Sequence, residues 1–254
     1  MPDTVRGLGL QFSLPDGELW RTAMINLPVF PLSTPEAFYE RLVASKPDPG
    51  TGKPDPGTGK PDPAQMQAFL ARHPETVQAM KVIKGEPFSS GFANSTFHGL
   101  NAFRFINAAG HSTPVRWLVT PEQPFEAAAA SAPRDKNYLF EELVAQMHRQ
   151  PLRWHLVVII GQPDDPTHDA AITWPAGREQ VDVGTLTLDR VESEQTSAAT
   201  NVNFDPLVLP VGIAPSDDPL LSARSAVYTR SFTRRQGEAK QPSAITSADV
   251  RKGD

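Results

Sequence analysis

Short apolar segments separated by turn-forming residues run through most of this 254-residue chain. Proline occurs 26 times. That is about twice its usual share, and each internal proline limits the length of a helix. The segments with the composition of strands are 5–12, 19–30, 102–107, 115–120, 154–160, 183–190 and 197–204. Many strands joined by hairpin-like turns predict an antiparallel sheet, closed as a β-barrel.

Helical patterns are inserted between these strands and follow them. The first begins after Ser33-Thr34, where a hydroxyl can cap the helix and Pro35 takes its first position. The other helical segments are 62–84, which Pro74 divides, 138–147 and 217–235. The predicted fold class is therefore α+β. One domain would span residues 1–237, and the polar tail 238–254 would be disordered.

A tandem repeat lies inside this domain. Residues 46–63 read KPDPGTG, KPDPGTG and KPDP, without an apolar side chain. Such a segment cannot bury a core and is typical of a solvent-exposed loop lengthened by duplication. The GTGK sequence lacks the preceding apolar strand and the full spacing of a phosphate-binding loop, so we do not read it as one.

Composition excludes several classes of function. The formal net charge is -5, which argues against nucleic acid as the main partner. No apolar run reaches the roughly 18 residues of a membrane span. The chain has no cysteine, which excludes disulfides, cysteine-ligated iron–sulfur clusters, thiolate-ligated haem and thiol peroxidase chemistry. None of the six histidines has the paired spacing of metal ligands.

Arg224 and Tyr228 form the most specific candidate site. They are four residues apart in a predicted helix and so lie on one face. A guanidinium beside a phenol favours the phenolate, although a free tyrosine has a pKa of about 10. Tyrosinate is one of the protein ligands of haem iron. The alternative is a hydrogen-bonded pair on a helix face without a catalytic role.

The surrounding residues extend this pattern. The chain resembles the haem catalases, and its shortness is similar to that of the small catalase-related peroxidases. The blocks that carry the resemblance are Val183-Gly184 to Arg190, Phe204-Asp205-Pro206, Gly212-Ile213, Arg224 to Arg235, Asp3 to Gly7, Asn26 to Phe30, and Phe92 to Asn107. The resemblance implies a catalase-like barrel with a C-terminal helix that carries the haem ligand.

The resemblance also implies roles for individual residues. Tyr228 would be the proximal axial ligand of a b-type haem iron, and Arg224 would bond its phenolate oxygen. Arg235 would lie near a haem propionate, and Phe38 would pack in the pocket on the distal side. Asn26 would lie in or beside the distal site and position peroxide.

Two departures from the family pattern concern the distal side. The catalytic asparagine of the family stands three residues before a proline, and here that register falls on Ile25, one residue before Asn26. The family's distal histidine, its general acid–base, lies several tens of residues upstream of the position of Arg6. We therefore expect the histidine, the first barrel strand and any export signal to lie outside this chain.

The function implied is reduction of hydrogen or organic peroxides by a haem-dependent peroxidase with a small-molecule electron donor. Two alternatives stay open: isomerisation of fatty-acid hydroperoxides on the same fold, and a truncated haem-binding fragment without catalysis. Neither nucleic acid nor a membrane is expected as a partner, and homo-oligomer formation is left open. A longer form would be periplasmic, with the cytoplasm as the alternative.

Deleting one KPDPGTG unit from residues 46–63 should leave thermal stability nearly unchanged. Loop-closure entropy varies slowly with length, by about 0.6 kcal/mol for each doubling. Thermal unfolding followed by circular dichroism measures the effect. A clear fall in melting temperature would show that the repeat packs against the domain.

Overall fold

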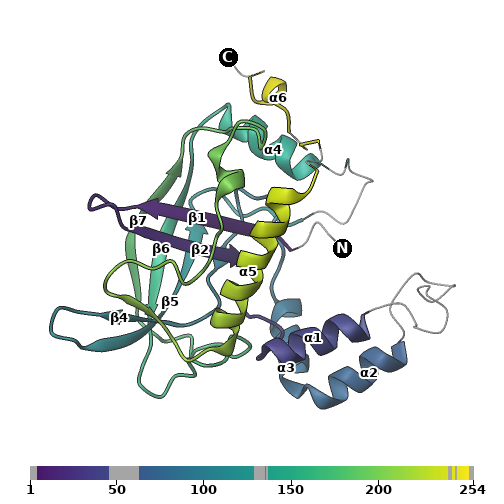
Figure 1. Ribbon diagram of the computed structural model, residues 1–254, viewed down its shortest axis with the longest axis vertical. Coiled ribbons are helices and arrows are strands. Elements are labelled where there is room, and N and C mark those ends of the chain that lie inside the picture. The colour runs from purple at the N-terminus through teal and green to yellow at the C-terminus, as the bar shows by residue number, and fades with distance from the viewer. Residues whose placement is uncertain are drawn as a thin grey trace.

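A computed structural model describes residues 5–45, 63–128, 135, 137–239, 242–243 and 245–251. Its centre is an eight-stranded antiparallel sheet with helices along its sides (Figure 1). The strands are β1 Gly7–Ser13, β2 Leu19–Ile25, β3 Phe97–His98, β4 Phe103–Ile106, β5 Ser112–Pro121, β6 Leu152–Ile160, β7 Gln180–Leu188 and β8 Ile213–Pro215. The helices are α1 Pro35–Ala44, α2 Pro63–Arg72, α3 Pro74–Gly85, α4 Tyr138–Met147, α5 Pro219–Gly237 and α6 Ser247–Arg251. The proline-rich repeat lies outside the described residues apart from Pro63.

Strand β5 organises the sheet. It pairs with β6 along one edge and with both β3 and β4 along the other. β2 and β1 continue beyond β3, β8 lies beside β4, and β7 lies beside β6. Within the described residues β1 pairs only with β2, β7 only with β6 and β8 only with β4, so the sheet is a curled half-barrel with three open edges. The antiparallel α+β fold is confirmed, whereas closure of the barrel is not seen in this part of the chain.

The concave side of the sheet holds the largest core. Trp117 stacks on Phe103 with ring centroids 4.2 Å apart, and meets Trp20 edge-on at 5.1 Å. Its indole Nε1 donates to Thr22 Oγ1 at 3.0 Å, so the buried polar atom is satisfied. Gly99 lies against this indole, because a Cβ there would stand 2.8 Å from Trp117 Nε1. Aromatic packing of this kind fixes where β3 ends.

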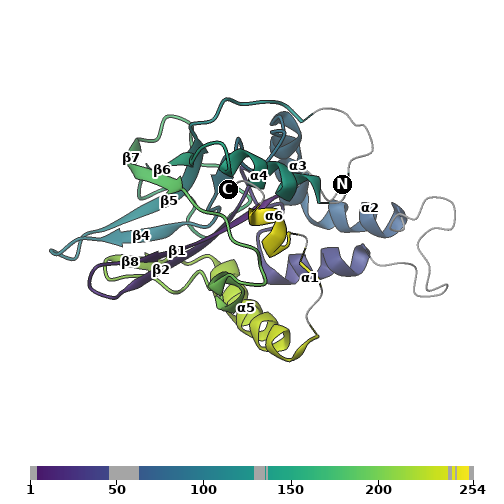
Figure 2. The same cartoon turned by 90° about the horizontal axis from the view of Figure 1, so that it is seen from above.

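Helices α1, α2 and α3 gather at one side of the sheet (Figure 2). α1 begins as predicted: Thr34 Oγ1 accepts from Ala37 N at 3.1 Å and Pro35 opens the helix. α1 packs on α2 through a separate apolar cluster that includes the fully buried Phe69. α5 contacts α1 and crosses the ends of β1 and β2 (Figure 1). Among the described residues, no helix is both long and apolar enough to cross a membrane.

One prediction about local structure is wrong. Residues 197–204 do not form a strand; a 3₁₀ turn spans Ala198–Asn201, because Ser197 Oγ accepts from Ala199 N at 3.1 Å and caps it. Within the tail predicted to be disordered, Ser247–Arg251 forms α6. His148 Nε2 donates to the carbonyl of Val250 at 2.7 Å, which ties this helix to the end of α4.

Gly99→Ala should destabilise the fold. The new Cβ would stand 2.8 Å from Trp117 Nε1 and 3.1 Å from the carbonyl oxygen of Trp117, and neither is a flexible side-chain end. Overpacking of this kind costs about 1–3 kcal/mol, which chemical denaturation measures.

Gly177→Ala is the matched control, because nothing lies within 4 Å of the Cβ it would add. Equal stability of the Gly99→Ala and Gly177→Ala variants would contradict the packing described for Trp117.

Candidate functional site

Arg224 and Tyr228 lie on one face of α5, as their spacing predicts. The Arg224 guanidinium nitrogen Nη2 donates to the Tyr228 hydroxyl oxygen at 3.2 Å. The centre of the guanidinium also stands 5.5 Å from the centroid of the phenol ring. Both side chains are half-buried. A fixed positive charge therefore stands at the oxygen of a phenol that is still accessible from one side.

Contacts outside α5 hold Arg224 in place. Nη2 also donates to the carbonyl of Ala23 on β2 at 3.0 Å, and Nη1 donates to Asn101 Oδ1. β3 is only two residues long, so it leaves the carbonyl of Ala23 without a strand partner on that side of β2. The guanidinium fills this position. Two acceptors from two segments outside α5 thus orient the arginine that faces Tyr228.

Asn101 and Asp218 stabilise the position of Arg224 through hydrogen bonds. Asn101 Nδ2 donates to Asp218 Oδ2 at 2.8 Å, so its amide oxygen must face Arg224. Asp218 also caps α5, because its Oδ1 accepts from Leu220 N at 2.8 Å. Burial raises the pKa of Asp218, and its hydrogen bonds with Asn101 and Leu220 oppose that rise. A hydrogen-bonded chain therefore runs from the start of α5 to the Tyr228 phenol.

A strained backbone conformation at Leu100 precedes Asn101. The preceding Leu100 has a φ of 62°, in the left-handed region that bulky residues rarely adopt. The link between β3 and β4 turns sharply there and directs Asn101 toward Arg224. Sequence reasoning missed both Asn101 and Asp218. Asp218 stands before Pro219, which is a helix-start signal that could have revealed it, whereas no local signal marks Asn101.

The other predicted cofactor residues lie on α5 and α1. Arg235 lies two turns beyond Tyr228 on α5, with its guanidinium 5.6 Å from the Phe232 ring. It lines a shallow hollow of about 300 Å³ together with Arg230 and Arg234. Phe38 lies on α1, the helix that contacts α5, and is 40% exposed. Its ring stacks on Phe30 at 6.1 Å.

Asn26 takes a structural position immediately after β2. Its Oδ1 accepts from the backbone N–H of Arg6 at 2.7 Å, and its own N–H donates to the Arg6 carbonyl at 3.1 Å. Arg6 is buried, and its guanidinium donates to Ser89 Oγ at 2.9 Å and Ser95 Oγ at 3.1 Å. These bonds anchor the start of β1 and fix the Asn26 side chain against it.

Three of the six histidines have distinctive surroundings. His98 on β3 is uncharged at neutral pH, because burial lowers its pKa to about 4. His73 and His155 each lie between two carboxylates. Within the part of the chain that the structure describes, no three His, Asp or Glu side chains converge as metal ligands would.

Asn101→Leu should lower the free energy of unfolding by about 1–3 kcal/mol. The substitution removes the hydrogen bonds that Arg224 and Asp218 each make with the Asn101 amide. Thr229→Ala, at an exposed position on α5, should cost far less. Denaturant titration of both variants compares them. Equal stabilities would show that Asn101 does not support Arg224.

Comparison with known proteins shows the family of this chain. A family model described as catalase matches residues 2–248. A catalase-related peroxidase of Synechococcus elongatus is 40% identical over 242 residues, which cover 92% of this chain and 68% of that protein. A catalase-related peroxidase of Mycolicibacterium paratuberculosis is 33% identical over 236 residues, covering 92% of this chain and 72% of its own length.

Solved catalases share the fold at lower sequence identity. A fungal catalase superposes with a TM-score of 0.76 at 18% identity, over 93% of this chain and 49% of its own. A bacterial catalase gives a TM-score of 0.73 at 22% identity, over 91% and 46%. The chain thus spans about half the length of these solved catalases. The match over nearly the whole chain shows that it belongs to the catalase family, a family of oxidoreductases.

Proposed function

We propose that this protein is a haem-dependent peroxidase that reduces hydrogen or organic peroxides with electrons from a small-molecule donor. The observation that carries the proposal is the hydrogen bond from Arg224 Nη2 to the Tyr228 oxygen, inside the region that matches the catalase family. Membership of that family implies haem. The b-type of the haem, its axial ligation by Tyr228 and the use of an electron donor belong to the proposal.

The residues present fit such a cofactor. An anionic phenol oxygen is a suitable fifth ligand for ferric iron, and Arg224 supplies the positive charge that favours it. Apolar and cationic side chains of the kind that a porphyrin contacts lie on α1 and α5, at Phe38 and Arg235. Haem, when bound, supplies the redox chemistry of peroxide reduction, and the protein supplies its binding and orientation.

Each side chain then has a stated task. Tyr228 would hold the iron, and Arg224 would hydrogen-bond the phenol oxygen from a fixed position, because Ala23 and Asn101 hold its guanidinium. Arg235 would face a propionate. Phe38 would exclude water from the opposite side of the pocket. Asn26 would donate an amide N–H to peroxide while its Oδ1 stays on the Arg6 backbone.

Tyr228→Phe should lose the haem or change its ligation, because the phenyl ring has no oxygen for the iron. The visible absorption spectrum after reconstitution measures this. Tyr138→Phe is the control, since Tyr138 lies on α4, away from the site. Arg224→Ala should weaken phenolate ligation, and Arg224→Lys should restore part of it. A Tyr228→Phe spectrum identical to wild type would contradict the ligand assignment.

Activity is tested separately from haem binding. The haem-loaded protein is expected to consume hydrogen peroxide or an organic hydroperoxide in proportion to oxidation of a phenolic donor. Stopped-flow absorbance follows both. Intact phenolate-ligated haem without donor-dependent turnover would support haem binding but reject the peroxidase function.

A further inference from the structure

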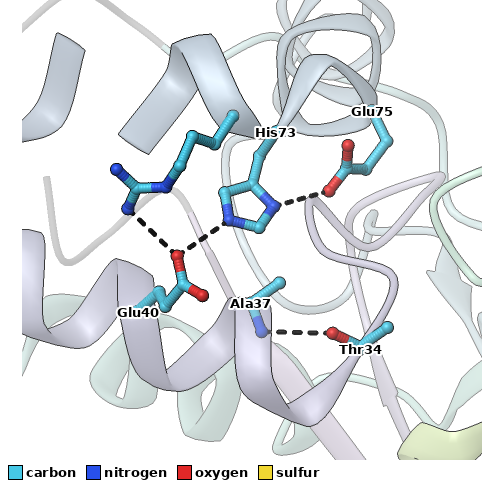
Figure 3. Close-up of polar contacts among 6 residues, drawn as sticks. Thr34, Ala37, Glu40, His73 and Glu75 are labelled. Atoms are coloured by element: carbon cyan, nitrogen blue, oxygen red, sulfur yellow. Dashed lines mark hydrogen bonds and ion pairs between the residues drawn. The ribbon is translucent and has the colours of Figure 1, made fainter. Parts of the chain in front are cut away.

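The ring of His73 lies between two carboxylates where α2 ends and α3 begins (Figure 3). Its Nε2 stands 3.1 Å from Glu40 Oε2 on α1, and its Nδ1 stands 2.9 Å from Glu75 Oε1 on α3. The ring stacks on Phe69 with centroids 4.4 Å apart, and the His73 side chain is only 15% exposed. The imidazole is therefore held with both nitrogens directed at negative oxygens.

Only one protonation state of the ring suits this position. A neutral imidazole carries one N–H donor and one nitrogen lone pair, whereas the imidazolium donates from both nitrogens. With a neutral His73, a lone pair would face either Glu40 or Glu75 at hydrogen-bond distance, which is repulsive. Both contacts are favourable together only when the ring is protonated.

A charged group from each surrounding helix takes part. Glu40 comes from α1 and Glu75 from α3. Arg72 at the end of α2 donates from Nη2 to Glu40 Oε2 at 3.0 Å, and this is the same oxygen that His73 contacts. Protonated His73 and Arg72 together balance the two carboxylates. Loss of the ring proton leaves an excess of negative charge among the three helices.

We infer that Glu40, Arg72, His73 and Glu75 form a proton-dependent connection, the His73 latch, which fastens α1 to α2 and α3 when His73 is protonated. The inference goes beyond peroxidase function, because none of these residues is assigned to the haem site. It concerns α1, however, which also carries Phe38. Loosening of α1 would alter the cofactor pocket only if the proposed function is correct.

The electrostatics agree with the geometry. Burial alone lowers the pKa of His73, but its hydrogen bonds with Glu40 and Glu75 outweigh burial, so the pKa rises above its ordinary value. The same bonds to His73 and Arg72 lower the pKa of Glu40. A histidine whose pKa is raised on folding stabilises the fold fully below its unfolded pKa, about 6.5. That contribution is lost as the pH rises through the folded pKa.

Opening the latch should loosen α1 without detaching it. Apolar contacts also hold this helix, since Ala37 and Ala44 of α1 share a buried cluster with Leu32 and Phe69. Residual packing of this kind keeps α1 in place at high pH. The expected change is therefore local motion of α1, not unfolding of the domain.

The protonation state is tested by NMR titration of the histidine ring resonances in the full chain. The His73 resonance should titrate above the ordinary histidine value, and Glu40→Gln and Glu75→Gln should each move its midpoint downward. Glu36→Gln is the matched control, because it removes an exposed carboxylate from the same helix. A midpoint at or below the ordinary value, or one that ignores both substitutions, would overturn the inference.

The mechanical role is tested by hydrogen exchange of the α1 amides as a function of pH. His73→Phe keeps an aromatic ring on Phe69 but cannot bind either carboxylate. Below the His73 midpoint, α1 should exchange roughly two- to fivefold faster in this variant than in wild type, the size expected for surface ion pairs. Above the midpoint the two proteins should converge. An equal difference at every pH would show lost packing only, and no difference at any pH would reject the latch.

Discussion

The guanidinium of Arg224 connects the parts of the molecule on which the candidate site depends. From one side chain it bonds strand β2 at Ala23, the β3–β4 link at Asn101 and the phenol of Tyr228. The short β3 makes this possible, because a longer strand would occupy the carbonyl that Arg224 uses. The same interaction that closes a gap in the sheet thus orients α5 and places a positive charge at the Tyr228 oxygen.

Charge balance explains why this arrangement is stable. A half-buried cation needs hydrogen-bond acceptors. Asn101 accepts from Arg224 through its amide oxygen and donates to the buried Asp218 side chain through its amide nitrogen. Asp218 in turn caps the helix that carries both Arg224 and Tyr228. Helix start, arginine and phenol therefore form one cooperative unit. Two carboxylates around His73 show a similar principle on the other side of α1, where a proton supplies the balancing charge.

Local patterns predicted local structure well. The helix expected at residues 138–147 is α4, and the i,i+4 spacing of Arg224 and Tyr228 produces the contact it indicates. Local patterns did not predict the long-range contacts. Asn101 reaches Asp218 across 117 residues through a link shaped by the strained Leu100, and no periodic pattern encodes that. Residues 197–204 contain Thr200, Val202 and Phe204, which strands favour, but also two alanines and two asparagines, which strands disfavour. The Ser197 cap decides their conformation instead.

The central claim is that Tyr228, held by Arg224, is the axial ligand of haem iron. Resonance Raman spectroscopy of the ferric haem-loaded chain tests it most directly, with natural and ring-deuterated tyrosine compared. The account predicts five-coordinate high-spin haem with tyrosinate vibrations that shift on deuteration and vanish in Tyr228→Phe. Vibrations that are insensitive to tyrosine deuteration, or a spectrum of histidine-ligated low-spin haem, would contradict it.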